Sequence, residues 1–294
     1  MSSGFNNFKS RYLLLDSFLI CIASIFITAL LYGIFGNDFI EQYNSLLEFL
    51  FYIFLFGVLC YSTFFRLRSN QVKLKDIIGD LNIKNIPWML LLIIFYGEQN
   101  LTTGINYLEY FFANLISNDL VQSTIANNRE IFESNSQNLL FKIFYYCLTV
   151  FVLVVVAPVT EEFIFRGIFL HRWAVKWGVV WSIVLSSLAF GLVHADIFML
   201  SRAVSSIFTA LFYIQTKTLL VPILLHAFHN GLVCINMTFQ DSSANDLNIT
   251  AKYLWYGILN VLLSLPVLFY FLKFPKSSDR LPYFVNLQKS CNLE

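Results

Sequence analysis

The chain has 294 residues, of which 57% are hydrophobic and 13% are charged, and it contains 32 Phe and 15 Tyr. No soluble core could hide that much apolar surface, so the composition predicts a membrane protein. The formal net charge of +1 gives no basic footprint for nucleic acid, and the scattered cysteines argue against a disulfide framework or a zinc knuckle.

Eight apolar runs are candidates for the roughly 20-residue helix that a bilayer requires. The first is longer than a signal-peptide core, so we expect it to remain in the mature chain as a span. The third contains GEQNLTTG (Gly97–Gly104), and we expect it to be kinked or divided there. The runs are Tyr12–Phe35, Leu46–Phe65, Trp88–Ile116, Leu140–His171, Val179–Ala195, Phe198–Gln215, Thr218–Asn236 and Tyr253–Phe274.

The cations between these runs predict the orientation, because short cytoplasmic loops are enriched in Lys and Arg. With both ends inside, all the cations of the connections lie inside except Arg129, Arg202 and Lys252. The polar segment Ser117–Asn138 then becomes an external loop. The sequence therefore predicts an all-α, polytopic membrane protein: a bundle of about eight transmembrane helices with both termini cytoplasmic, forming one domain over residues 1–294.

Three charged residues interrupt the fourth run, in the stretch APVTEEFIFRG. Ionisable groups at membrane depth are costly and often functional. Glu162 and Arg166 lie four residues apart, in the favourable order for a helical ion pair, whereas Glu161 has no partner in its own helix. Pro158 is expected to break or kink the helix just before the glutamates. The stretch therefore predicts either a structural ion pair or a general base, with Glu161 as the base.

Two later motifs carry histidines at helical spacing. FGLVHA places Phe190 and His194 on one helix face, and HAFHN places His226 and Asn230 on another. Counted from the inner charged ends at 1.5 Å per residue, these residues and Glu161 lie about 14 to 22 Å deep. We therefore expect a polar chamber near mid-membrane.

Hydrolysis inside the bilayer fits such a chamber. Glu161 would take a proton from water, His194 would assist, and His226 with Asn230 would stabilise the oxyanion. A zinc site made by Glu161, His194 and His226 is the alternative. The chain lacks H-E-x-x-H, G-x-S and G-x-G-D sequences, which disfavours other intramembrane proteases.

Four further polar residues receive weaker interpretations. His229 could replace His226, although it lies off the stripe shared by His226 and Asn230. Asp196 could orient His194. Glu98 and Gln99 could line the chamber, but a hydrogen bond within the bundle is the favoured interpretation.

The three motifs resemble those of the CAAX protease and bacteriocin-processing family of intramembrane endopeptidases, also called Abi proteins. The family pattern is E-E-x-x-x-R, then F-x-x-x-H, then H-x-x-x-N or D, and this chain has EEFIFR, FGLVH and HAFHN. The resemblance covers residues 140–236, which would be the catalytic core. It implies an eight-helix protease with catalytic Glu161, His194, His226 and Asn230, supported by Glu162 and Arg166.

The resemblance further implies a peptide or protein substrate, lipidated or otherwise bound to the membrane. No cofactor is favoured, and zinc stays possible. The Phe-, Ile- and Asn-rich composition suits a low-GC bacterium, hence the cell membrane, or the endoplasmic reticulum membrane in a eukaryote. Two alternatives remain: a non-proteolytic bacteriocin-immunity or binding protein that uses the polar cluster structurally, and a small transporter, which the lack of paired repeats disfavours.

Overall fold

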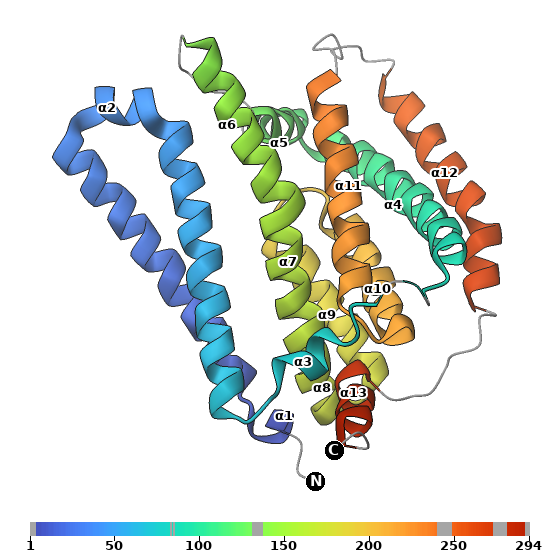
Figure 1. Ribbon diagram of the computed structural model, residues 1–294. Helices are drawn as coiled ribbons and strands as arrows, with labels where there is room; N and C mark the ends of the chain where they lie inside the picture. The colour runs from blue at the N-terminus through green and yellow to red at the C-terminus, as the bar shows by residue number, and fades with distance from the viewer. Residues whose placement is uncertain are drawn as a thin grey trace.

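The computed structural model describes residues 4–82, 84, 86–130, 138–239, 249–272 and 281–291. Within these residues the regular structure is entirely helical, as the sequence predicts. Figure 1 shows the long helices running side by side, with short helices gathered at one end. The helices are α1 (Gly4–Asn7), α2 (Ser10–Ser69), α3 (Leu74–Ile78), α4 (Trp88–Ile116), α5 (Asn118–Glu130), α6 (Leu139–Phe151), α7 (Ala157–Glu162), α8 (His171–Trp177), α9 (Val179–Val193), α10 (Met199–Thr216), α11 (Leu220–Phe239), α12 (Ile249–Leu272) and α13 (Pro282–Cys291).

The first two predicted spans both lie within α2, which bends back on itself to form two arms (Figure 1). Arg66 on the second arm contacts Asp16 on the first, with Arg66 Nη2 2.6 Å from Asp16 Oδ2. A straight helix would separate two residues 50 positions apart by about 75 Å, at 1.5 Å per residue. The ion pair therefore requires the bend, and it joins the arms near their open end.

The third predicted span corresponds to α4, and the expected division at GEQNLTTG is wrong: α4 is continuous through it. Its small residues instead allow close packing against α12. A Cβ atom added to Gly104 would lie 2.9 Å from the Gly257 carbonyl oxygen, and one added to Gly97 would lie 2.4 Å from the Val267 side chain. The glycines thus serve a helix crossing, in the manner of small residues between membrane helices.

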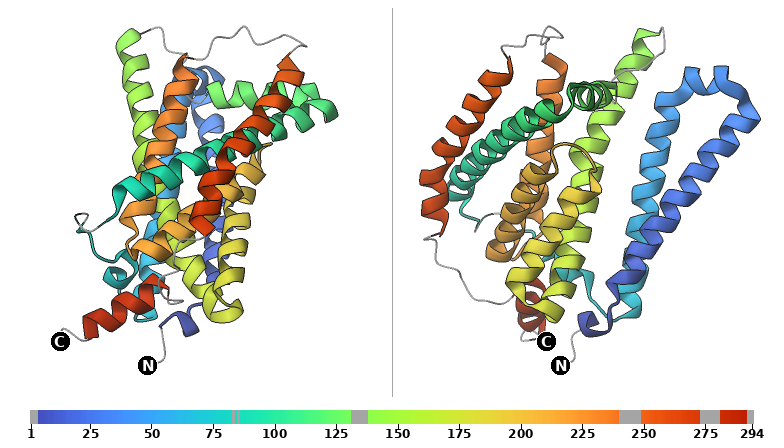
Figure 2. Two further views of the ribbon diagram at one scale, coloured as in Figure 1. Left: turned by 90° about the vertical axis from the view of Figure 1, so that its right-hand side faces the viewer. Right: turned by 180° about the vertical axis from the view of Figure 1, so that it is seen from behind.

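The segment predicted as an external loop is also helical in part. Asn118–Glu130 forms α5, which Figure 2 shows crossing one end of the bundle, while residues 131–137 lie outside the described part of the chain. Polar helical periodicity is hard to distinguish from a loop when no apolar stripe marks it, which explains the error.

The fourth predicted span is one long rod, Leu139–Trp177, that carries the glutamates. Pro158 does not break it, so the predicted break is wrong, while the alternative of a kink stays a prediction. Instead, two π-helical segments flank α7: η2 (Val152–Val156) before it and η3 (Phe163–Leu170) after it. A π turn accommodates an irregular hydrogen-bond register without ending the helix.

Short helices close one end of the bundle, where α1 and α13, the first and last described helices, both lie (Figures 1 and 2). His171 is fully buried there and stacks on Phe5, with its Nε2 accepting a hydrogen bond from the Tyr283 amide 3.1 Å away. Asn286 of α13 donates to the carbonyl oxygens of Asp76 and Lys217. Several loops predicted to be cytoplasmic therefore meet at the same end of the molecule.

Within the described residues, two helical segments are long and apolar enough to cross a membrane, Ser10–Leu31 and Leu139–Trp177, and two shorter apolar helices are Val179–Val193 and Leu220–Asn236. Large apolar side chains, such as Phe26 and Trp181, are widely exposed on the outer surface. This supports a membrane protein. The number of eight spans and the cytoplasmic position of the termini stay predictions.

Candidate active site

The predicted ion pair between Glu162 and Arg166 is confirmed and lies at the centre of the molecule. Arg166 Nε is 3.0 Å from Glu162 Oε2, and the two side chains are 2% and 0% exposed. Arg166 Nη2 also donates to the Ser206 carbonyl oxygen, the Ser206 hydroxyl and the Thr209 hydroxyl of α10. The pair therefore links the α7–η3 rod to α10. This is the structural ion pair that the sequence predicts.

His226 of α11 faces both glutamates. Its Nδ1 donates to Glu162 Oε1 at 2.8 Å, and its Nε2 lies 3.8 Å from Glu161 Oε2. Because Glu162 is held by Arg166 from its other side, the imidazole plane is fixed with Nε2 directed toward Glu161. Glu161 is 21% exposed, far more than Glu162. It therefore remains open to a water molecule or a substrate, as the prediction for a general base requires.

His194 joins this group from the end of α9. Its Nδ1 donates to the Phe190 carbonyl oxygen at 2.8 Å, which fixes the ring and leaves Nε2 as an acceptor in the neutral imidazole. The Phe190 ring contacts the rings of both His194 and His226, with centroids 4.9 and 5.9 Å apart, and the charge of Glu161 acts on both histidines. The structure thus brings together Glu161, His194 and His226, which lie far apart in sequence.

Asn230 lies on the same face of α11 as His226, as predicted, but its contact differs from the predicted role. Its Nδ2 donates to the Leu153 carbonyl oxygen in η2 at 2.7 Å. One amide N–H is therefore engaged with the backbone of the rod that carries the glutamates. The oxyanion role expected from the resemblance stays a prediction.

His229, Gln99 and Glu98 form a hydrogen-bond network of their own, separate from the contacts of Glu161 and Glu162. His229 does not replace His226 beside the glutamates: its Nδ1 donates to Gln99 Oε1 at 2.6 Å, and Gln99 Nε2 donates to Glu98 Oε2 at 2.6 Å. The favoured interpretation of Glu98 and Gln99, a hydrogen bond within the bundle, is confirmed. Glu98 is 2% exposed, so this second network also lies deep in the structure.

Asp196 does not orient His194, contrary to the weaker interpretation. Its Oδ1 accepts the Phe198 amide, and its Oδ2 pairs with Arg202, so both oxygens serve the turn between α9 and α10. Glu109 of α4 supports the next turn by accepting the Leu200 and Ser201 amides. Sequence analysis did not identify Glu109; a carboxylate from another helix that caps α10 has no local sequence signal.

The zinc alternative would require Glu161, His194 and His226 to act as ligands together. In the described part of the chain, no group of three or more His, Cys, Asp or Glu side chains is arranged to hold a metal ion. His226 donates Nδ1 to Glu162 and directs Nε2 toward Glu161, an arrangement that zinc-binding histidines also adopt. As placed, the three side chains are not gathered into a three-ligand zinc site, and metal dependence stays a prediction.

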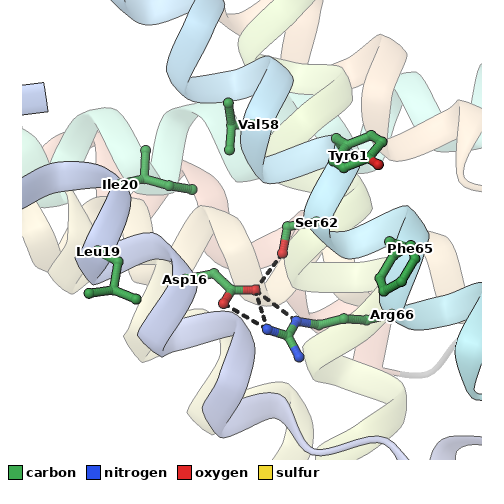
Figure 3. Close-up of a pocket in the computed structure, with 8 residues that line it drawn as sticks. All are labelled: Asp16, Leu19, Ile20, Val58, Tyr61, Ser62, Phe65 and Arg66. Carbon is green, nitrogen blue, oxygen red and sulfur yellow. Dashed lines mark hydrogen bonds and ion pairs between the residues drawn. The ribbon is translucent and has the colours of Figure 1, made fainter. Parts of the chain in front are cut away.

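The pocket drawn in Figure 3 lies away from this group, between the two arms of α2. Figure 3 shows Asp16 hydrogen-bonded to Ser62 and Arg66, with Leu19, Ile20 and Val58 among its apolar walls. It contains none of the predicted site residues.

Comparison with known proteins agrees with the motifs. Residues 143–232 match the family model described as type II CAAX prenyl endopeptidase Rce1-like. The chain is also 36% identical over 102 residues to a Bacillus subtilis (strain 168) protein named "Putative membrane peptidase YdiL". That alignment covers 34% of this chain and 42% of the relative, so the chain spans less than half of the curated relative that it matches. No solved structure matches the chain.

The matched residues 143–232 include all three motifs and every predicted site residue. The resemblance that the motifs predict is therefore confirmed: over these residues the chain is similar to the CAAX protease and bacteriocin-processing family of intramembrane endopeptidases.

Proposed function

We propose that this protein is an intramembrane endopeptidase in which Glu161 activates water. The observation that carries the proposal is the contact of Glu161 with His226, at 3.8 Å, beside the buried Glu162–Arg166 pair. Glu162 is buried and pairs with Arg166 and His226, whereas Glu161 is partly exposed and near two imidazoles. This division gives one carboxylate a supporting role and leaves the other available for chemistry.

The reaction follows from these positions. Glu161 removes a proton from water as the water oxygen bonds to the scissile carbonyl carbon. His194, held by its Nδ1, uses Nε2 to orient that water. His226, as an imidazolium, donates from Nε2 to the developing oxyanion while Nδ1 stays on Glu162. The intermediate then expels the amine as the C–N bond breaks, and the proton on Glu161 passes to that amine.

The substrate is proposed to be a peptide or membrane-bound protein that reaches the cluster from the bilayer. The peptidase family match supports this class of substrate. We further propose that the protein resides in a bacterial cell membrane, with about eight spans. A lipid attached to the substrate is consistent with the apolar surroundings of the cluster.

Mass spectrometry of membrane peptides tests the proposal, with cells that carry either the wild-type protein or Glu161→Gln. The substitution keeps the shape of the side chain and removes the base. We expect peptides produced by the wild type to disappear, because loss of a general base costs about 10²- to 10⁴-fold in rate. Asp119→Asn, at an exposed position of α5, is the matched control and should leave the peptides unchanged.

The same experiment separates the proposal from a non-proteolytic immunity or binding role. If Glu161→Gln is folded and abundant yet yields the same peptides as the wild type, the protein is not acting through Glu161. Purified protein in a strong chelator tests the zinc alternative separately. Full cleavage in chelator is expected here, whereas loss of cleavage that zinc restores would favour the metal mechanism.

A further inference from the structure

The carbonyl oxygen of Leu153 occupies an unusual place in the long rod that carries the glutamates. In a regular α-helix it would accept the amide of Ala157, four residues on. Here the Ala157 amide instead donates to the Val152 carbonyl, five residues back, in the register of a π turn. The amide of Ala157, which would pair with Leu153 in an α-helix, therefore pairs with Val152 instead.

The π-helical donor of Leu153 is missing as well. Continuing the same five-residue register would pair Leu153 with residue 158, which is proline and has no N–H. The rod thus offers Leu153 neither of its two usual donors. An unpaired carbonyl in an apolar interior costs free energy, so a donor from elsewhere is expected.

Asn230 supplies that donor. Its Nδ2 is 2.7 Å from the Leu153 carbonyl oxygen, and because a carbonyl oxygen only accepts, the amide nitrogen must face it. Asn230 lies one helical turn after His226 on the same face of α11. The bond therefore joins α11 to the rod about two turns before Glu161 and one turn of α11 from the contact of His226 with both glutamates.

We propose that Asn230 is a positioning residue that replaces the N–H which Pro158 lacks, and so holds the π turn that sets the direction of Glu161. Relaxation of a π turn to an α turn shifts the register by one residue, which turns the following residues by about 100° relative to the preceding ones. Such a turn would carry Glu161 away from His226. The missing N–H of Pro158 and the donor of Asn230 thus act together, through the Leu153 carbonyl, to align two helices at the site.

A double-mutant cycle between Pro158 and Asn230 tests this directly. Asn230→Ala leaves Leu153 unpaired, and Pro158→Ala returns a backbone N–H that can donate to the Leu153 carbonyl in the π register. We expect Asn230→Ala alone to lower the thermal unfolding midpoint in detergent by about 2 to 4 °C. In the Pro158→Ala background the same substitution should cost less than half as much, since the carbonyl no longer depends on Asn230.

The cleavage rate per folded molecule gives a second readout, and this arm alone depends on the proposed function. Small misplacements of reacting groups cost up to about 10²-fold in rate, so Asn230→Ala should lower kcat strongly. Adding Asn230→Ala to Pro158→Ala should then lower kcat by less than about tenfold. A direct oxyanion donor would instead be lost equally in both backgrounds, and that result would overturn the proposal.

Two further variants sharpen the outcome. Asn230→Leu keeps roughly the size of the side chain but removes the donor, so it should lower the unfolding midpoint at least as much as alanine. Asn260→Ala is the matched control, because the Asn260 amide donates to the Tyr256 carbonyl of its own helix on an exposed face. If the wild type cleaves nothing, the unfolding midpoints still decide the proposal: equal costs in both backgrounds would refute it.

Discussion

Two arginine–carboxylate pairs in this protein have very different surroundings. Arg66 and Asp16 link the arms of α2 with side chains that are 30% and 20% exposed. Arg166 and Glu162 lie between the rod, α10 and α11 with side chains that are 2% and 0% exposed. Figure 3 shows the first pair beside an open pocket, with Tyr61 and Phe65 nearby on the second arm.

The difference lies in the number of helices that each pair holds together. Arg66 and Asp16 connect two parts of a single helix, whose outward side chains, such as Phe26 and Phe65, stay largely exposed. Arg166 and Glu162 bond to Ser206 and His226, on two other helices. A buried charge that loses its partner cannot be solvated, whereas a charge near the surface can be. Only the buried pair should therefore control both the fold and the site.

Arg166→Met gives the largest expected effect on stability. It leaves the buried Glu162 with only His226 as a partner, and breaking a buried ion pair typically costs about 3 to 5 kcal/mol of the free energy of unfolding. Chemical denaturation in detergent, followed by tryptophan fluorescence, measures the loss.

The double variant Arg166→Met with Glu162→Gln is the control for this prediction, since it removes both charges. It should recover a large part of the lost free energy. A double variant as unstable as Arg166→Met would show that packing of the arginine, rather than its charge, dominates.

Gln99→Leu should have an intermediate effect, because it removes the bridge between Glu98 and His229. Both groups would then be left with an unmet hydrogen bond in the interior, at a cost of about 1 to 3 kcal/mol. The free energy of unfolding under the same denaturing conditions measures it.

Asn100→Leu is the matched control for Gln99→Leu. Its amide donates to the Tyr96 carbonyl on an exposed part of α4, so a small change is expected. Equal losses in the two variants would mean that the bridge to His229 contributes nothing specific.

Asp16→Asn should have the smallest effect. Partly exposed ion pairs contribute about 0 to 1 kcal/mol, and asparagine can still accept from Ser62 or Arg66. Unfolding measurements at low and high salt check this, and a loss comparable to that of Arg166→Met would break the distinction between the two pairs.

Much of the helical pattern was available from the sequence, because apolar run length reports directly on helices in lipid. The run Trp88–Ile116 matches α4 at both ends, and the spacing of Glu162 and Arg166 correctly predicted their ion pair. The errors arose where a residue acts through a distant neighbour. Gly97 and Gly104 looked like a break in a helix until α12 was seen to pack against them.

The sequence by itself determined the class of protein, the helical elements and the chemical groups of the site, since composition and helical spacing are local properties. Only the tertiary structure decided which partner each polar group takes. His226 rather than His229 faces the glutamates, Asp196 turns to Arg202, and Asn230 binds a carbonyl that Pro158 cannot serve. These choices depend on how helices distant in sequence are rotated against one another, because every buried polar group must find its partner across a helix interface.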